Sequence, residues 1–350
     1  MSLIADLARP DILALKAYSQ AAWEPSLQRM HANELPWRVE GDSSQAGLNR
    51  YPEPQPPPLV EGMARCYGVS PKQLLVGRGS DEAIDLLLRV FCRAGQDSIL
   101  VCPPTYSMYA VAAGIQGAGI VRVPLLADQG FALDVEAVIA AVVPGVKLVF
   151  VCSPNNPTGN AVPRAQLLDL ARRLADRAMV VVDEAYAEFM DEASVAPDIA
   201  LYPNLVVMRT LSKSHGLAGA RCGALIADPE LIGLARKVIP PYAITELTVE
   251  AVAPLLAPAG IAAMQARVKT LLAERARLAA ALATVKGVIK IWPSDANFLM
   301  VDFTDPAAVL RKVQGAGLII RDMRQQYLPQ ALRISIGTPE QNDILLRSLA

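Results

Sequence analysis

Short apolar runs alternate with amphipathic stretches along the first two thirds of the chain. The runs are rich in Val, Ile and Leu, and intervening stretches such as 81–94 and 164–177 carry apolar residues at helical spacing. Parallel strands buried on both faces read as continuous apolar runs, and helices connect them. The pattern therefore predicts an α/β domain with a mostly parallel sheet, with strands near residues 75, 100, 121, 149, 182, 207 and 225.

The pattern changes after residue 243. A long helix rich in Ala, Leu and Arg is predicted over about 260–286, and shorter strands and helices follow it up to a last helix from Pro339. This indicates a smaller α+β domain. We expect residues 1–48 to form an N-terminal arm and part of the small domain, 49–243 a large domain and 244–350 the small domain. A cleft between two domains is a common place for a small-molecule site.

Charge and composition narrow the class of protein. The chain has 33 basic and 34 acidic side chains and a formal net charge of -1, so it lacks the positive field that nucleic acid or an anionic membrane attracts. No stretch reaches the length of a membrane span, and the N-terminus lacks the pattern of a secretion signal. We therefore expect a cytoplasmic protein with no nucleic-acid or membrane partner.

Cysteine and histidine usage agrees with a reducing compartment. The five cysteines are scattered in mostly apolar contexts, which favours free thiols. His31 and His215 are the two histidines, and neither has metal-ligand spacing to a cysteine or to the other, so no metal site is predicted.

Four predicted strands are followed by polar residues that could carry chemistry. Ser80 and Asp81 begin a helix, Asn156 lies in the turn SPNNPTG, Asp183 ends an apolar strand, and Lys213 lies in TLSKSHGLAGARCGA. Loops at the carboxyl ends of parallel strands face one crevice, so these residues are expected to converge. Each motif also has a structural interpretation, as a helix cap, a turn or a buried salt bridge.

Taken together, the four strand ends match what pyridoxal phosphate requires. The aldehyde of that cofactor needs an amine, its ring nitrogen needs an acid, and its phosphate needs N–H donors, a hydroxyl and an arginine. The chain supplies this set with Lys213, Asp183, Asn156, Ser80 and Arg221.

The motifs that carry these residues resemble those of fold-type I pyridoxal phosphate aminotransferases. LNRYPEP, PPTYSMY and SPNNPTG, together with GRGSDEAID, VVDEAYAEF, RTLSKSHGLAGARCG, ANF and LRISIGTPEQN, resemble more closely the histidinol-phosphate aminotransferase family, over essentially the whole length. The resemblance implies that Lys213, Asp183 and Tyr186 are catalytic. Lys213 would anchor the cofactor and move the proton, and Asp183 would hold the ring-nitrogen proton. The implied cofactor contacts are Tyr51 from a second subunit, Ser80, Asp81, Glu82, Tyr106, Asn156, Asp183, Tyr186, Thr210, Ser212, Lys213 and Arg221.

For the substrate, the resemblance implies Arg321, Arg333, Tyr18 and Asn156. The planar fork of an arginine pairs with carboxylate and with phosphate, so one pocket could take both partners of an amino transfer. The implied reaction interconverts L-histidinol phosphate and imidazole-acetol phosphate with 2-oxoglutarate and glutamate, in a homodimer. His215 stands where relatives commonly have an aromatic residue, and we interpret it as a core residue or one behind the site.

Three other functions stay open at this stage. A threonine-phosphate decarboxylase and an aromatic amino acid aminotransferase would use the same cofactor set. A non-catalytic pyridoxal phosphate sensor is a different class, but such sensors are fused to a DNA-binding domain. We expect no such extension here, and the complete catalytic set argues against a sensor.

Overall fold

The computed structural model describes residues 2–19, 24 and 26–350. Its large domain is built on a seven-stranded sheet with the order β1-β7-β6-β5-β4-β2-β3. Neighbouring strands from β3 to β6 are parallel, whereas β7 is antiparallel to both β1 and β6. The predicted mostly parallel sheet is confirmed. Its strands are β1 (Leu74–Gly77), β2 (Ser98–Val101), β3 (Gly119–Arg122), β4 (Val146–Cys152), β5 (Met179–Asp183), β6 (Leu205–Thr210) and β7 (Gly223–Ile226).

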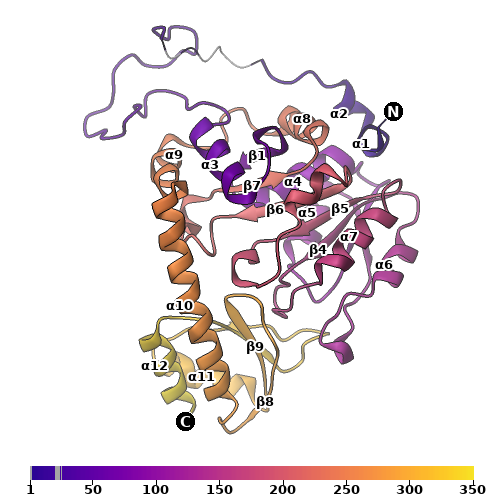
Figure 1. Cartoon of the computed structure of the whole chain (residues 1–350), viewed down its shortest axis with the longest axis vertical. Helices are drawn as coiled ribbons and strands as arrows, with labels where there is room; N and C mark the ends of the chain where they lie inside the picture. The colour runs from indigo at the N-terminus through magenta and orange to yellow at the C-terminus, as the bar shows by residue number, and fades with distance from the viewer. Residues whose placement is uncertain (1, 20–23, 25) are drawn as a thin grey trace.

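Helices cover both faces of this sheet (Figure 1). Side chains alternate across a strand, so Val180 and Val182 pack with one core cluster and Met179 and Val181 with the other. The first face is covered by α3 (Pro57–Tyr67), α6 (Val135–Ala141) and α7 (Arg164–Arg173). The second is covered by α1 (Leu3–Leu7), α2 (Pro10–Ala14), α4 (Ser80–Phe91), α5 (Met108–Gln116) and α8 (Pro229–Val238).

The small domain is an antiparallel sheet of order β10-β11-β9-β8 with helices packed against it. After α9 (Glu246–Val252), the long helix α10 (Pro258–Leu282) runs from the large domain to the small one (Figure 1). The other elements are β8 (Val288–Ile291), β9 (Phe298–Phe303), α11 (Pro306–Gly315), β10 (Arg321–Asp322), β11 (Ala331–Ser335) and α12 (Pro339–Leu349). Short 3-10 helices lie at Pro71–Gln73, Ala127–Gln129, Ala187–Phe189, Ala196–Ala200, Ala218–Ala220 and Ala253–Leu256.

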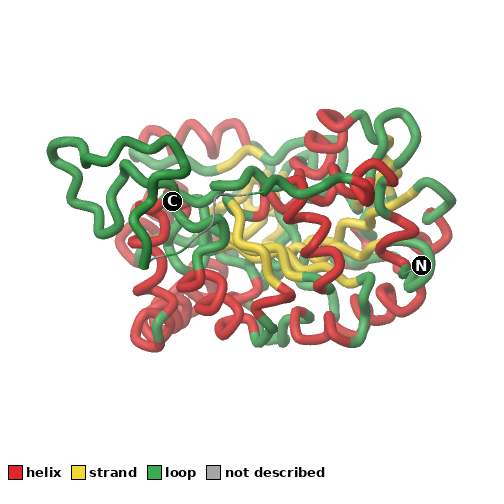
Figure 2. Tube along the Cα trace, turned by 90° about the horizontal axis from the view of Figure 1, so that it is seen from above, coloured by secondary structure: helices red, strands yellow, loops and turns green. Residues whose placement is uncertain are grey.

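The N-terminal segment packs on the large domain, although part of it was expected in the small one. Ile4, Leu7 and Ile12 join the core on the α4 and α8 face. Residues 26–56 form a loop on the outside of the molecule (Figure 2), and large apolar side chains such as Met30 and Trp37 are exposed on it. The proline-rich patch ends inside α3, because proline fits the first turn of a helix.

No single helix within the described ranges is long and apolar enough to cross a membrane. The pair Glu246–Leu256 and Pro258–Leu282, bent by 77°, meets that test of length and composition only when its two parts are counted together.

Two glycines should respond oppositely to substitution by alanine. At Gly223 in β7, a Cβ would stand 2.6 Å from the carbonyl oxygen of Arg209 and 2.9 Å from the Cα of Gly79. At Gly233, inside α8, a Cβ would meet nothing within 4 Å. We expect Gly223→Ala to lower the free energy of unfolding by about 1–3 kcal/mol and Gly233→Ala to raise it by about 0.5–1 kcal/mol.

Urea unfolding of both variants and the parent protein measures the difference. Equal stability of Gly223→Ala and the parent would contradict the tight approach of β7 to the Gly79 turn.

Candidate active site

A cavity of about 600 Å³ lies where the carboxyl ends of β4, β5 and β6 meet the small domain. The start of α4 and the loop before α5 form one wall, and β10 with β11 forms the opposite wall. The predicted convergence of strand ends is thus confirmed. The lining residues that were predicted from the sequence are Ser80, Asp81, Tyr106, Asn156, Asp183, Tyr186, Thr210, Ser212, Lys213, Arg221, Arg321 and Arg333.

Asp183 is the buried acid of this cavity, with 2% of its surface exposed. Its carboxylate accepts hydrogen bonds from the Tyr109 hydroxyl at 2.6 Å and from the backbone N–H of Ala185 at 3.1 Å. Burial raises the pKa of Asp183 to about 6, although these two hydrogen bonds act to lower it. A cation facing this carboxylate would relieve the cost of burying its charge.

The contact with Tyr109 was missed in the sequence. Tyr109 lies on α5, three residues after Tyr106, and its ring stacks on Phe150 at 4.8 Å. In the sequence it reads as an apolar position of a helix. The available signal was its spacing of three residues from Tyr106; Tyr106 itself lies just before α5, and the two rings meet edge to face at 5.6 Å.

A chain of hydrogen bonds joins the two domains across the cavity. The Asn156 side-chain amide donates to the Tyr186 hydroxyl at 3.3 Å, and its carbonyl oxygen accepts from Nη1 of Arg333. Arg333 lies on β11, and its guanidinium is also 5.3 Å from the centre of the Phe298 ring. The SPNNPTG turn therefore connects the large domain to a cation of the small domain.

Lys213 lies between these groups on the loop after β6. Its amine is 5.7 Å from the centre of the Tyr186 ring. Desolvation by the cavity walls, followed by the positive charge of Arg333, lowers the pKa of Lys213, although the side chain stays accessible. A larger share of the amine is therefore neutral and nucleophilic than for a lysine in water.

The start of α4 and Arg221 form an anion cradle. The N-cap of α4, Gly79, supplies no side-chain cap, and the first N–H groups of a helix, here those of Ser80 and Asp81, have no partner within the helix. Arg221 reaches the cradle beside Gly79, where a Cβ would stand 3.2 Å from its Nη2. The same guanidinium pairs with Asp81 at 3.2 Å, and Asp81 also accepts from the Tyr106 hydroxyl at 3.0 Å.

Two hydroxyls complete the cradle, whereas one predicted side chain turns away from it. Thr210 donates to Ser212 at 3.0 Å, and both line the cavity. The carboxylate of Glu82 instead accepts from the Arg78 backbone N–H at 2.7 Å and pairs with its guanidinium at 2.5 Å. The Glu82 carboxylate is thus bound to Arg78 and does not line the cavity.

Arg321 lines the cavity from β10 of the small domain. It is exposed on β10 and pairs in register with Arg333 on β11. The following residues also line the cavity, and Arg324 forms a 2.6 Å ion pair with Asp322 there. This wall therefore carries an excess of positive charge suited to an anionic ligand.

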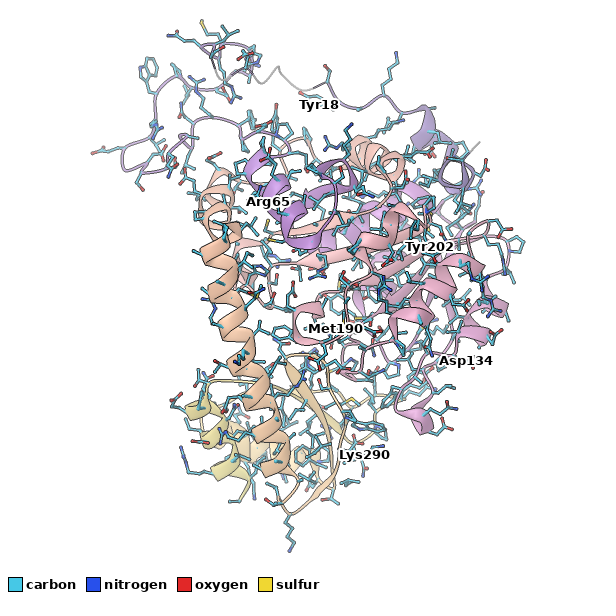
Figure 3. The ribbon with its side chains drawn as sticks, viewed as in Figure 1. Tyr18, Arg65, Asp134, Met190, Tyr202 and Lys290 are labelled. Carbon is cyan, nitrogen blue, oxygen red and sulfur yellow. The ribbon has the colours of Figure 1, made fainter. Side chains whose placement is uncertain are left out.

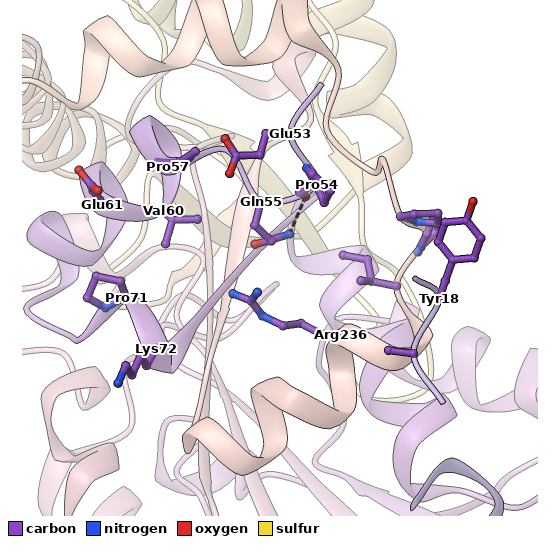
Figure 4. Close-up of a pocket in the computed structure, with 14 residues that line it drawn as sticks. Tyr18, Glu53, Pro54, Gln55, Pro57, Val60, Glu61, Pro71, Lys72 and Arg236 are labelled. Atoms are coloured by element: carbon purple, nitrogen blue, oxygen red, sulfur yellow. Dashed lines mark hydrogen bonds between the residues drawn. The ribbon is translucent and has the colours of Figure 1, made fainter. Parts of the chain in front are cut away.

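Tyr18 and Tyr51 lie outside this cavity in a single chain. Tyr18 is on the N-terminal arm, far from the small domain that carries Lys290 (Figure 3). It lines a second cavity of about 750 Å³ together with Gln55 and Arg236, and its hydroxyl points away from that cavity (Figure 4). Tyr51 is also exposed on the arm, and its ring stacks on Tyr242 at 4.4 Å.

His215 is buried behind the Lys213 loop, with 6% of its surface exposed. Its Nδ1 lies 2.9 Å from the Ser214 hydroxyl, and desolvation lowers the pKa of its ring. Four of the five cysteines are buried, Cys66 is exposed, and all are free thiols.

The donor set of the cavity fits a phosphorylated pyridine aldehyde. A nucleophilic amine, a buried acid and an anion cradle surround one space, and the absent Cβ of Gly79 leaves room for Arg221 at that cradle. Within residues 2–19, 24 and 26–350, no three His, Cys, Asp or Glu side chains are grouped so that they could hold a metal ion.

Comparisons with known proteins agree with this geometry. The family model of aminotransferase class I and II matches residues 22–349. The chain is 47% identical over 352 residues to the histidinol-phosphate aminotransferase of Xylella fastidiosa (strain 9a5c), covering 99% of this chain and 96% of that relative. It is 46% identical over 350 residues to that of Stenotrophomonas maltophilia (strain R551-3), covering 98% and 96%.

A solved structure has the same fold. The histidinol-phosphate aminotransferase of Sinorhizobium meliloti, crystallised in complex with pyridoxal-5'-phosphate, superposes with a TM-score of 0.78 at 27% identity over 86% of this chain and 82% of that one. The chain therefore belongs to the class I and II aminotransferases, and within them to the histidinol-phosphate aminotransferase family.

Proposed function

We propose that this enzyme transfers the amino group of L-histidinol phosphate to 2-oxoglutarate, with pyridoxal phosphate as cofactor. The observation that carries the proposal is the presence of Lys213, Asp183 and Arg333 around one cavity. The relatives at 46–47% identity act on histidinol phosphate by name, which supports this substrate for the present chain.

In this proposal, different residues of the cavity hold different parts of the cofactor. The cradle of Ser80, Asp81 and Arg221, with the hydroxyls of Thr210 and Ser212, holds the phosphate. Asp183 holds the proton on the ring nitrogen, and Tyr186 with Asn156 bonds the ring hydroxyl oxygen. Tyr106 covers a face of the ring. When bound, the cofactor supplies an aldehyde carbon that receives the amino group and a ring that accepts electrons from the substrate carbon.

Lys213 has two tasks in this proposal. Its neutral amine would hold the aldehyde end of the cofactor between turnovers, by condensing with the aldehyde and releasing water. The same amine would then move the proton between the substrate carbon and the cofactor. The lowered pKa of Lys213 suits both tasks, because each needs a neutral amine at working pH.

The cations of the small domain bind the substrate in this proposal. Arg333 is held by Asn156 at the inner end of the cavity, where it meets the carboxylate of glutamate or 2-oxoglutarate. Arg321 lies nearer the mouth, where it adds a second fork for the phosphate of histidinol phosphate. Amino donors of both kinds thus use one pocket.

We also propose a homodimer in the cytoplasm. Tyr51 is exposed on the arm and does not line the cavity of its own chain, as expected of a residue that serves the neighbour's cofactor. The exposed apolar side chains of the same arm, Leu35, Trp37 and Val39, would be covered by a second copy. The free thiols agree with a reducing compartment.

The proposed substrate is tested by measuring glutamate formation from 2-oxoglutarate with each of three amino donors. We expect kcat/KM for histidinol phosphate to exceed that for phenylalanine by about 10³-fold or more, because phenylalanine has no phosphate for a site built to bind one. O-phosphothreonine, the third donor, should release no carbon dioxide. Carbon dioxide release in place of glutamate formation would overturn the proposed reaction.

The two arginines should affect the substrates differently. We expect Arg333→Ala to impair both half-reactions, because the carboxylate and the phosphate both need its fork. Arg321→Ala should impair histidinol phosphate more than glutamate, and the loss of a charge-assisted bond should cost about 1.5–3 kcal/mol of transition-state binding. Single-turnover kinetics of each half-reaction measures the difference. Equal losses with both substrates in Arg321→Ala would argue against its role at the phosphate.

Mixed dimers test whether Tyr51 serves the neighbour. Consider a dimer of one Lys213→Ala and one Tyr51→Ala subunit. If each site takes its Tyr51 from the neighbour, one of the two sites carries both substitutions and the other site carries neither. Each parent dimer should be weak at limiting cofactor, because loss of a hydrogen bond to the phosphate lowers retention by about 10- to 100-fold. Activity should therefore return on mixing. If the subunits exchange and no activity returns, Tyr51 contacts the cofactor of its own chain or contacts no cofactor.

A further inference from the structure

A buried ion cluster lies directly behind the active site and takes no part in the proposed chemistry. Alternation along β5 and β6 sends Asp183 toward the α5 face, whereas Glu184 and Arg209 continue the row of Val180, Val182, Leu205 and Val207 on the opposite face. The side chains of Glu184 and Arg209 are exposed by 1% and 7%. Charges buried this deeply need a specific reason.

Arg209 holds both ends of the segment that carries Tyr186. Its Nη1 bonds Glu184 at 2.7 Å, and its Nη2 bonds Glu188 at 2.7 Å. Glu184 directly follows Asp183, and Glu188 lies two residues after Tyr186. The guanidinium also lies 4.6 Å from the centre of the Tyr67 ring on α3, which limits its movement.

The same arginine directly precedes Thr210, whose hydroxyl contacts Ser212 next to Lys213. One planar fork therefore joins the strand that leads to Lys213 with the turn that carries Asp183 and Tyr186. A fork with fixed geometry can set the position of two carboxylates at once, which a lysine cannot do.

Stability alone explains this cluster poorly. Two carboxylates face one guanidinium, and among the described residues no hydrogen-bond partner is found for Glu188 Oε2, Arg209 Nε, Tyr67 Oη or His215 Nε2. A buried ion pair loses so much hydration that an apolar replacement often gives an equally stable protein. The definite positions that such a pair imposes on its partners are a better reason for its presence here.

We propose that Arg209 is a positioning residue: by clamping Glu184 and Glu188, it holds Asp183 and Tyr186 at the places where they meet the cofactor. The inference rests on the roles proposed above for these two residues. It concerns the cofactor end of the cavity, whereas the substrate arginines lie on the small domain and are outside the clamp.

The clamp is tested by replacing Arg209 with methionine and with lysine. We expect Arg209→Met to lower kcat by about 10- to 100-fold, because small displacements of catalytic groups have effects of this size. The dissociation constant of pyridoxal phosphate should rise and the absorption of the bound cofactor should change. KM for both amino donors should stay close to the parent value. Arg209→Lys should recover part of kcat, because its ammonium can still pair with one of the two carboxylates.

Arg164→Met is the matched control. Arg164 forms a two-pronged ion pair with Asp198 at 2.6 and 2.7 Å and does not line the cavity. This variant should lose thermal stability while it keeps the parent's cofactor affinity and kcat. If Arg209→Met does not fold, Glu188→Gln, which removes one arm of the clamp, is compared with Glu136→Gln, which removes a surface pair with Arg173.

Two results would overturn the clamp. The first is that Arg209→Met has a lower melting temperature but the same cofactor affinity and kcat as the control Arg164→Met. The second is that Glu188→Gln and its control Glu136→Gln have equal cofactor affinity and equal kcat. Asp183→Asn and Tyr186→Phe, measured beside them, separate this result from a failure of the proposed function. If those two variants keep full activity, the assigned roles are wrong. If they lose activity while Arg209→Met keeps it, only the clamp is wrong.

Discussion

A carboxylate at the end of a wholly apolar strand is the constraint on which the rest of the site depends. Asp183 is buried, its pKa is raised to about 6, and its protein partners are a tyrosine hydroxyl and a backbone N–H, both neutral. In the absence of a facing cation, the folded protein binds this proton more tightly than the unfolded chain does, so stability is lost as the pH rises from about 4 through about 6. A protonated ring nitrogen reverses that balance, because it supplies the missing positive charge.

The small domain completes the site from the other side. Arg333 contacts Asn156 of the large domain, and Asn156 also contacts Tyr186, so one turn holds both the arginine proposed to bind the substrate and the proposed ring contacts. Desolvation and the nearby positive charge of Arg333 lower the pKa of Lys213, and Arg221 pairs with Asp81 at the start of α4. In the proposed arrangement, one cavity holds a phosphate at the start of α4, a proton acceptor at Lys213 and an anionic substrate at Arg333 and Arg321.

Much of this arrangement could be predicted from residues at strand ends. Lys213, Asp183 and Asn156 each follow a continuous apolar run, and parallel strands bring such positions together. Tyr109 could not be assigned, because a helical tyrosine in an apolar stretch gives no sign of the partner of its hydroxyl. The sequence contained one sign of the proposed role of Arg209, which is a charged residue inside the apolar run LVVMRT. The partners of Arg209 could not be predicted, because they depend on the register of β5 and β6. Tyr18 and Tyr51 lie on the N-terminal arm, outside the cavity, and the proposed role of Tyr51 needs a second chain.

The central claim is that the amine of Lys213 and the carboxylate of Asp183 hold one cofactor between them. The most direct test is reduction of the protein with borohydride in the presence of pyridoxal phosphate, followed by peptide mapping. The account predicts that the reduced cofactor is found on Lys213 alone, and that Lys213→Ala retains none of it. Attachment to a different lysine, or equal labelling of several lysines, would contradict the account.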